Sequence, residues 1–431
     1  MIEPKILKGF RDFLPAAEME RRALVGKIEA SFRSFGFVPI DTPVLEYAEI
    51  LLGKGGGETE KQIYRFTDHG GRDVALRFDL TVPFARFLAE HGPELPLPFK
   101  RYHIAKVWRG ENTQRGRYRE FTQCDFDIVG SDSPAADFEI LLLIRNTLEA
   151  IGAGNVTIRL NHRGLFNRFL EQIHCRESSV DILRIVDKLA KTGREATLQS
   201  LSDLAGRDAA ERLLDYIEVR GSFEDTLDRI TEAAGGACPE SERLASIRRF
   251  MIDAGCGDRF VLDPSITRGL DYYTGVVYES FLNEIPEIGS VCSGGRYDDL
   301  AGLYSREKLS GVGSSIGLDR LIAAMESLGR LRGQDSYALA AVACVNEARG
   351  GSYQALAGEI RKQGIPCEVF PEAKKLVRQF VMAEKKGIPW VIIPGEKPLT
   401  DPLTLREIAE RRDFEALSLE KLIGIIQGTN P

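Results

Sequence analysis

The feature that most constrains the fold is a pair of strand-forming runs joined by a polar loop, at residues 101–109 and 118–129. The first run is rich in aromatic and β-branched residues, which suit a pleated sheet. The second run alternates with period two, so its side chains divide between two faces. One face would pack on a core: Tyr118, Thr122, Cys124, Phe126 and Ile128. The other face is largely polar: Arg117, Arg119, Phe121, Gln123, Asp125 and Asp127.

The polar face of the second run mixes arginines, a flat aromatic ring and hydrogen-bond acceptors. A guanidinium can hold phosphate or carboxylate through two hydrogen bonds, and Phe121 could stack on a flat base. Gln123 and Asp127 could accept hydrogen bonds from an ammonium or a ring N–H group. The face therefore suits a ligand with a phosphate, a flat ring and a cationic amine. A solvated hairpin with charge pairs would show the same alternation.

Length, net charge and cysteine content limit the possible folds and functions further. A length of 431 residues is too great for one simple core, so two or three domains are expected. The net charge of −7 weakens the case for a polynucleotide partner without excluding one, because local patches matter more than totals. The seven cysteines are scattered and form no CxxC or Cys/His cluster, so neither structural zinc nor disulfides are expected. The first residues do not resemble a signal peptide and no apolar run could span a membrane, which predicts a cytoplasmic protein with no membrane partner.

The N-terminal part predicts a helix followed by a strand. Residues 18–35 place Leu24, Ile28 and Phe32 at the four-residue spacing of an amphipathic helix. The strand expected at 37–45 contains two prolines, which cannot donate to a ladder, so it should lie at an edge or an interface.

Residues 74–84 predict a strand that runs into a helix, with Pro83 well placed to start the helix. Asp79 and Thr81 fall near the turn between the two elements. This carboxylate and hydroxyl could hold an ammonium group, or they could cap the helix. Residue types alone leave both interpretations open.

The middle of the chain predicts a change of structure. A helix is expected at 132–151 and a strand at 156–160. From 163 to 255 the helical period is clear and Leu, Ala, Arg, Glu and Asp dominate, which predicts a helical insertion between the strands of the main domain. A strand returns at 259–263, and a glycine-bearing strand enters a helix at 311–325.

Residues 331–336 form a polar linker, which predicts a domain boundary. Beyond it strands and helices alternate, which predicts a small α/β domain with a largely parallel sheet. Five basic residues give this acidic chain a local basic face: Lys374, Lys375, Arg378, Lys385 and Lys386. The face suits RNA, and a solvated helix would carry the same charges.

The central hairpin resembles a known motif. Trp108–Glu111 and Arg119–Gln123 are similar to motif 2 of the class II aminoacyl-tRNA synthetases. Within that class, their residues most resemble motif 2 of the histidyl-tRNA synthetase family. The N-terminal helix and proline-containing strand resemble motif 1, which builds the dimer interface in that class. The run 311–325 resembles motif 3.

Further runs extend the resemblance over nearly the whole chain. Residues 266–278 and 292–298 are similar to two histidine signatures of this family. Residues 372–378 and 384–390 resemble its anticodon-binding domain. The order of these motifs along the chain makes the resemblance more specific than any one of them.

The resemblance implies an α+β fold. Its main domain would be a class II synthetase-type antiparallel sheet with flanking helices, interrupted by a helical insertion and followed by a C-terminal α/β domain. The expected domains are a catalytic domain in two parts, 1–162 and 256–330, an insertion at 163–255 and an anticodon-binding domain at 331–431.

The resemblance also implies an activity, that of a histidine–tRNA ligase. Such an enzyme activates L-histidine with ATP to histidyl-adenylate and passes the histidyl group to tRNA(His). The implied cofactor is Mg²⁺ bridging the phosphates of ATP. The implied partners are L-histidine, ATP, tRNA(His) and a second copy of the chain.

Site residues follow from the same resemblance. Two arginines would meet the α-phosphate and the substrate carboxylate as catalytic groups: Arg109 and Arg268. The α-ammonium would be held by Asp79, Thr81 and Gln123. The imidazole would be recognised by Asp127, Tyr272 and Tyr273, and Tyr297 would close the pocket. ATP would meet Arg109, Glu111, Arg117 and Phe121, with Arg320 on the γ-phosphate. Many bacterial members carry Glu where this chain has Asp79, so the carboxylate reaches one methylene less far.

A second function is compatible with the same motifs. Chains that resemble this synthetase family serve as non-catalytic regulatory subunits of ATP phosphoribosyltransferase, in histidine biosynthesis. Those chains typically lack the C-terminal domain and have eroded signatures. Here the C-terminal domain, Arg268, both tyrosines and motif 3 are present, which favours the enzyme.

Overall fold

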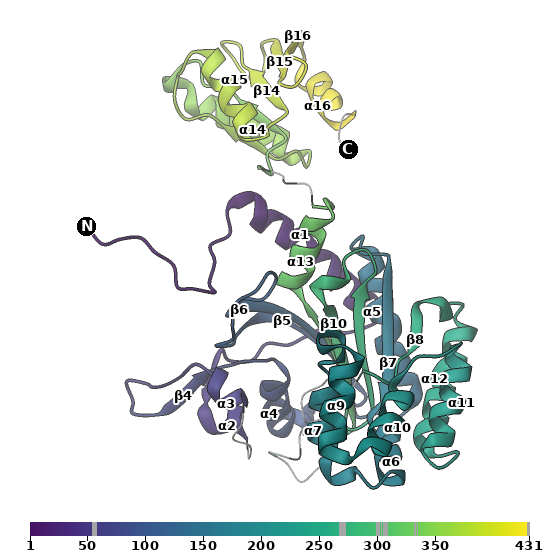
Figure 1. The fold of residues 1–431 in the computed structure, drawn as a ribbon. Coiled ribbons are helices and arrows are strands. Elements are labelled where there is room, and N and C mark those ends of the chain that lie inside the picture. The colour runs from purple at the N-terminus through teal and green to yellow at the C-terminus, as the bar shows by residue number, and fades with distance from the viewer. Residues whose placement is uncertain are drawn as a thin grey trace. The chain divides into compact units, whose positions relative to one another are not determined.

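The computed structural model describes residues 1–53, 58–266, 273–298, 302, 304, 309–331, 333 and 335–428 (Figure 1). The chain divides into two compact units. The larger unit comprises residues 1–11 and 24–330, and the smaller comprises residues 12–23 and 331–431. Among the described residues, each helix is too short or too polar to cross a membrane.

The larger unit is built on an eight-stranded sheet in the order β1-β5-β6-β11-β10-β9-β7-β8. Its strands are β1 (Val38–Pro39), β5 (Phe99–Trp108), β6 (Glu120–Val129), β7 (Val156–His162), β8 (Phe260–Leu262), β9 (Val276–Leu282), β10 (Ser290–Tyr297) and β11 (Gly311–Gly317). The inner pairs are antiparallel, and β1 and β8 pair in parallel at the two edges. The antiparallel sheet expected from the sequence is confirmed, and the strand with Pro39 lies at its edge.

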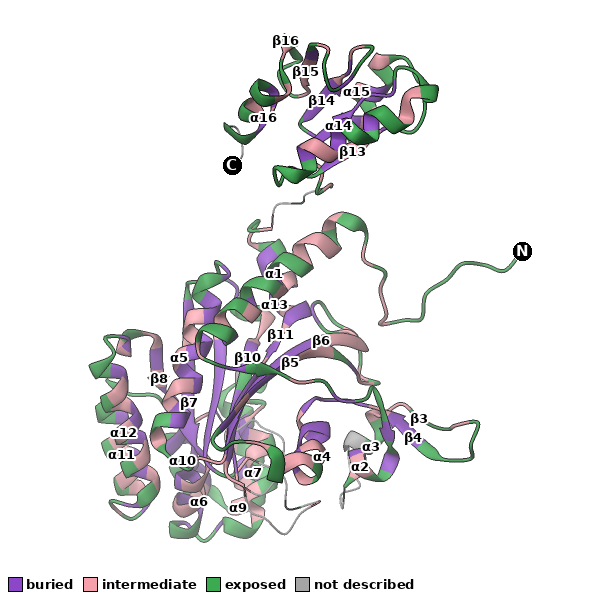
Figure 2. Cartoon of the chain, turned by 180° about the vertical axis from the view of Figure 1, so that it is seen from behind, coloured by how far each residue is buried: buried purple, intermediate pink, exposed green. Residues whose placement is uncertain are grey.

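The central hairpin of β5 and β6 pairs without a break from Phe99↔Val129 to Trp108↔Glu120. The apolar face of β6 is buried, as the alternation predicts, and Figure 2 shows the central strands largely buried. Helix α1 (Pro15–Ser34) covers part of this face through Leu24, Ile28 and Phe32, which are buried as predicted. The ring centroid of Phe32 lies 4.7 Å from that of Phe126.

Helix α5 (Pro134–Ala150) also packs on the sheet, and its start is fixed by local chemistry. The side chain of Ser133 accepts a hydrogen bond from the N–H of Ala135, and Pro134 occupies the first helical position. Its apolar side lies in the core, with Ile140 and Ile144 fully buried. The fold therefore supports the hairpin from the face opposite its polar side chains.

A small subdomain precedes the hairpin. It contains a three-stranded sheet of β2 (Leu45–Tyr47), β3 (Arg65–Thr67) and β4 (Asp73–Leu76), and the helices α2 (Ala48–Leu52), α3 (Glu58–Gln62) and α4 (Thr81–His91). Between β7 and β8 the chain is helical: α6 (Arg163–Gln172), α7 (Ser179–Val186), α8 (Leu189–Thr192), α9 (Arg194–Ala205), α10 (Arg207–Ile217), α11 (Phe223–Ala233) and α12 (Pro239–Asp253). Helix α13 (Leu318–Ser327) follows β11 directly.

The smaller unit contains a five-stranded sheet in the order β13-β12-β14-β15-β16. Its elements are β12 (Ala340–Val342), α14 (Gly350–Lys362), β13 (Cys367–Val369), α15 (Leu376–Lys385), β14 (Trp390–Ile393), β15 (Leu403–Glu407), β16 (Arg412–Leu417) and α16 (Leu419–Gly428). Strands β13, β12 and β14 pair in parallel, whereas β14 with β15 and β15 with β16 pair antiparallel. The largely parallel sheet expected from the sequence is therefore found in only half of the strand pairs. The sequence did not predict β15, β16 and α16. The turn between the two strands lacks a glycine, and Arg411 itself takes the positive φ of 51°.

Candidate active site

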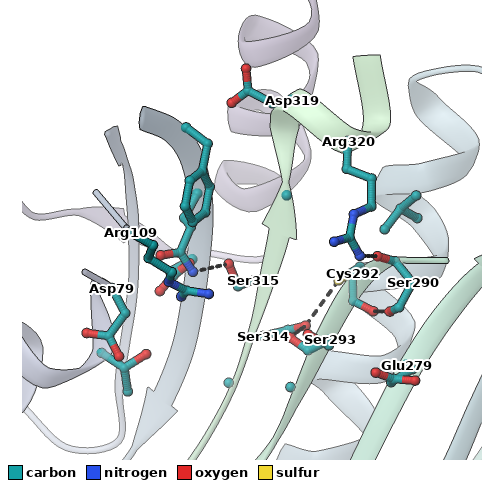
Figure 3. Close-up of a pocket in the computed structure, with 18 of the residues that line it drawn as sticks. Asp79, Arg109, Glu279, Ser290, Cys292, Ser293, Ser314, Ser315, Asp319 and Arg320 are labelled. Atoms are coloured by element: carbon teal, nitrogen blue, oxygen red, sulfur yellow. Dashed lines mark hydrogen bonds between the residues drawn. The ribbon is translucent and has the colours of Figure 1, made fainter. Parts of the chain in front are cut away.

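A cavity of about 300 Å³ opens on the polar face of β6 (Figure 3). Its lining comes from β6, β9, β10, β11, the start of α13, the loop after β5, the residues just before β9, and the turn into α4 with its first residue. Eleven of the residues singled out in the sequence line it together: Asp79, Thr81, Arg109, Glu111, Arg117, Phe121, Gln123, Asp127, Tyr273, Tyr297 and Arg320. Arg268 and Tyr272 lie outside the described residues. The individual roles assigned to these residues stay predictions.

Two arginines and a carboxylate stand at the hairpin loop. Arg109 donates from Nε to the carbonyl of Phe78 at 2.8 Å, and its guanidinium lies 5.1 Å from the ring centroid of Phe121. The carboxylate of Glu111 is 3.8 Å from Arg109 Nη1 and 3.9 Å from Arg117 Nη1. Both separations are longer than a good hydrogen bond, so Glu111 does not occupy the terminal nitrogens of these arginines and an incoming phosphate can bind them.

Only one of the two carboxylate oxygens of Asp79 stabilises the turn that leads into α4. Oδ1 accepts a hydrogen bond from the N–H of Val82 at 3.1 Å, whereas Oδ2 is buried with no hydrogen-bond partner among the described residues. Burial raises the pKa of Asp79 to about 6, against the opposing charges of Arg109 and Arg101. Helix capping and ligand binding are therefore compatible here, because each can use its own oxygen.

The polar face of β6 presents further acceptors to the cavity. Gln123 donates from Nε2 to Ser315 Oγ at 2.9 Å. Within the described part of the chain, Gln123 Oε1 and Asp125 Oδ1 are buried without a hydrogen-bond partner. Burial raises the pKa of Asp125 to about 7. Unpaired buried acceptors are costly, so a cavity that gathers them suits a ligand rich in N–H donors.

Asp127 is already engaged by protein groups. Tyr297 donates its hydroxyl proton to Asp127 Oδ1 at 2.6 Å, and Arg101 Nη2 lies 2.7 Å from Asp127 Oδ2. Arg101 is fully buried, directly opposite Asp127 on β5, with its guanidinium 4.0 Å from the ring centroid of Phe84. Arg101 was not predicted as a site residue, because its position opposite Asp127 depends on the register of β5 against β6, which the sequence does not show.

Glycines on β10 and β11 make the floor of the cavity. A Cβ at Gly313 would lie 1.9 Å from Asp127 Oδ1, and a Cβ at Gly294 would lie 2.1 Å from the carbonyl oxygen of Gly313. Real Cβ atoms do not approach so closely, so neither position accepts a side chain. Gly313 thus leaves the space that Asp127 occupies, and Gly294 leaves room for the backbone of β11.

The far wall of the cavity is set by the start of α13. Arg320 donates from Nη1 to the carbonyl of Ser290 at 2.7 Å, and Figure 3 shows it across the cavity from Arg109. Asp319 accepts a hydrogen bond from the N–H of Thr122 at 2.7 Å and forms an ion pair with Arg11. The N-terminal segment therefore helps to fix the junction of β11 and α13.

Tyr118 corrects one expectation. The alternation assigned it to the core face, but it lines the cavity, and the guanidinium of Arg11 lies 3.4 Å from its ring centroid. The reason is that β6 begins at Glu120, so Tyr118 belongs to the loop and does not follow the strand alternation. Other lining residues were also missed, because they come from strands whose pairing the sequence does not reveal: Tyr278, Glu279, Ser290, Cys292, Ser293, Ser314 and Ser315.

The arrangement gathers arginines and an aromatic ring at one part of the cavity and buried carboxylates at another. Arginines suit phosphate, and Phe121 suits a flat ring. Buried acceptors suit an ammonium or ring N–H donor. The cavity is therefore fitted chemically to a nucleotide beside a small cationic molecule.

Comparison with known proteins agrees with this chemistry. Residues 9–321 match the family model for histidyl-tRNA synthetase, and residues 340–429 match that for an anticodon binding domain. A histidine–tRNA ligase of Treponema denticola is 53% identical over 396 residues, covering 90% of this chain and 88% of that protein. A histidine–tRNA ligase of Treponema pallidum is 51% identical over 421 residues, covering 96% and 95%.

A solved structure shows the same architecture. The crystal structure of histidyl-tRNA synthetase from a Nostoc species superposes with a TM-score of 0.86 at 30% sequence identity, covering 99% of this chain and 100% of that chain. The shared fold, the extent of the family match and the identity to its members lead to one conclusion. The chain belongs to the histidyl-tRNA synthetase family.

Proposed function

We propose that the protein is a histidine–tRNA ligase, which activates L-histidine with ATP and transfers the histidyl group to tRNA(His). The observation that carries this function is the cavity itself. It sets buried, unpaired acceptors at Asp79 and Gln123 within reach of the arginines of the hairpin loop. A cationic amino acid and a phosphate can therefore be held side by side, as adenylate formation requires.

In the first step a carboxylate oxygen of histidine attacks the α-phosphorus of ATP in line. The new O–P bond forms as the bond to the pyrophosphate oxygen breaks, and negative charge spreads over the phosphoryl oxygens. Positioning and fixed positive charge lower this barrier. Arg109 is held by the carbonyl of Phe78, so its charge needs little reorganisation. We assign Arg109 and Arg268 to the α-phosphate and the carboxylate.

The histidine subsite lies along β6. The α-ammonium donates to Asp79 Oδ2 and Gln123 Oε1, with Thr81 beside them, and both acceptors are otherwise unpaired among the described residues. The imidazole meets Asp127, Tyr272 and Tyr273. Rejection of amino acids without ring N–H groups follows, because the buried acceptors would then go unpaired.

The ATP subsite lies at the loop and at α13. Phe121 stacks on adenine, Glu111 and Arg117 stand nearby, and Arg320 meets the γ-phosphate. Glu111 and Glu279 place carboxylate oxygens on the cavity lining, which are the donors that Mg²⁺ prefers. Bound there with ATP, Mg²⁺ would neutralise charge on the phosphates.

The remaining partners follow from the family. The smaller unit would bind the anticodon of tRNA(His), with the basic residues of α15 and its flanks on that face. Lys374 and Lys386 form ion pairs with Glu372 and Glu368, which neutralises part of the face in the free protein. We also propose a homodimer through the segment of β1 and β2, where Val38, Val44 and Tyr47 are exposed, and a cytoplasmic location.

The function is tested by histidine-dependent exchange of pyrophosphate into ATP, followed by charging of purified tRNA with each amino acid in turn. A ligase supports exchange with histidine alone and charges only tRNA(His). A regulatory subunit of ATP phosphoribosyltransferase would support neither reaction. The intact set of cavity residues and the presence of the smaller unit favour the ligase.

A further inference from the structure

The carboxylates of the cavity differ in how they are used. Asp127 accepts a hydrogen bond from the Tyr297 hydroxyl at Oδ1 and forms an ion pair with Arg101 at Oδ2, although the geometry of that pair does not make a hydrogen bond. Asp125 is as deeply buried, at 2% exposed, yet its Oδ1 has no hydrogen-bond partner within the described part of the chain. A buried carboxylate oxygen left open in a cavity needs a donor from outside the protein.

Asp125 also occupies the right place along the strand. It lies on the same face of β6 as Gln123 and Asp127, midway between them, and faces Ser315 across the pair with β11. Alternate residues of a strand are about 6.7 Å apart, and a histidine molecule is about as long as one such interval. With its α-ammonium at Gln123, the substrate therefore brings its ring to the level of Asp125.

The charges of the cavity also favour a cationic ring beside Asp125. Asp79, Asp125 and Asp127 are all buried carboxylates. Arg101 forms an ion pair with Asp127, and the α-ammonium of the substrate would pair with Asp79. Asp125 forms no ion pair among the described residues, and a cationic ring beside it would supply one.

We infer that Asp125 is a further specificity residue, which accepts a hydrogen bond from the imidazole of the substrate and holds that ring in its protonated form. The inference rests on the proposed histidine–tRNA ligase function and deepens it. Asp127 then accepts from, or aligns, the opposite edge of the ring, and Arg101 acts as a positioning residue that holds the Asp127 carboxylate in place.

Other charged and titratable groups surround Asp125, and each has a defined part. Burial lowers the pKa of His103, opposite on β5, to about 4, so it adds no positive charge near neutral pH. Burial raises the pKa of the Cys292 thiol to about 12, so it adds no negative charge. Arg77, Asp79, Arg101 and Asp127 also face Asp125, and Glu279 lines the same cavity. These groups are common to the unaltered protein and to Asp125→Asn, so a difference in proton uptake between the two proteins belongs to Asp125 and the ring.

The experiment is the uptake of protons when histidine binds, measured by calorimetry at about pH 8 in buffers of different ionisation enthalpy. At that pH the free imidazole is neutral and Asp125 is largely ionised, so binding to the unaltered protein should take up about one proton more than binding to Asp125→Asn. Equal uptake by the two proteins overturns the inference. The difference between them cancels any proton taken up by the α-amino group.

Kinetics give a second readout that a merely structural residue would not move. In pyrophosphate exchange, Asp125→Asn should raise KM for histidine by roughly tenfold to a hundredfold, as expected for a lost hydrogen bond to a charged group, while KM for ATP stays the same. The preference for histidine over triazolylalanine, whose ring has the same shape but is a far weaker base, should largely disappear. A variant that keeps this preference contradicts the inference.

A matched control separates specificity from the loss of any buried carboxylate. Glu46 is buried and pairs with Arg86 at 2.9 Å, away from the cavity lining. Glu46→Gln should leave KM for histidine and the analogue preference unchanged. If the unaltered protein shows no histidine-dependent exchange, the proposed function itself fails, which is distinct from normal exchange that Asp125→Asn leaves untouched.

Discussion

Asp125→Asn should stabilise the ligand-free protein at about pH 8.5 and leave its stability nearly unchanged at about pH 5.5. Burial raises the pKa of Asp125 from 3.8 to about 7. At about 1.4 kcal/mol per pH unit, holding Asp125 ionised costs the folded state on the order of 4 kcal/mol. A buried asparagine in its place costs about 1–3 kcal/mol for unpaired amide groups. The net gain for the variant at high pH is therefore about 1–3 kcal/mol.

The sign follows from proton binding. Between its unfolded and folded pKa values, Asp125 binds more protons in the folded than in the unfolded state, so the free energy of unfolding falls as pH rises from about 4 to about 7. Above that pH range the free energy of unfolding has lost the whole contribution of Asp125 and stays constant in this respect. The amide side chain of the variant does not titrate, so the two stability curves should separate with rising pH and become parallel above about pH 8.

Tryptophan fluorescence during urea unfolding can report on the larger unit alone. The chain has two tryptophans, Trp108 on β5 and Trp390 on β14, so a Trp390→Phe background leaves Trp108 as the probe. Glu46→Gln is the control, because it removes a paired carboxylate and should not stabilise the protein at any pH. A constant difference between Asp125→Asn and its parent from about pH 5.5 to 8.5 would refute the reasoning.

Three further predictions concern binding and are checked by pyrophosphate exchange. Tyr297→Phe removes the hydroxyl that donates to Asp127 and should raise KM for histidine about tenfold, with KM for ATP unchanged. Gly313→Ala drives a methyl group onto the Asp127 carboxylate and should abolish exchange while the protein stays folded, and weak but measurable exchange at saturating histidine would contradict a closed subsite. Arg320→Ala removes a guanidinium that the Ser290 carbonyl orients and should raise KM for ATP roughly tenfold to a hundredfold, leaving KM for histidine intact.

Much of the site could be predicted because strand alternation and motif order are local properties of the chain. The period-two pattern of β6 placed Phe121, Gln123, Asp125 and Asp127 on one face, and all four line the cavity. The order of the motifs identified the family, which the comparisons confirm. Tyr118 was placed wrongly, because the sequence does not mark the residue at which the strand begins.

The sequence by itself determined which residues share a face of a strand and which chemistry they could serve. Only the tertiary structure decided which residues form ion pairs. Arg101 pairs with Asp127 across β5 and β6, and Arg11 pairs with Asp319, which lies far from it in the sequence. The physical reason is that strand register and burial depend on the packing of distant segments. The same packing removes water from Asp125 and raises its pKa, which no pattern of neighbouring residues in the chain can reveal.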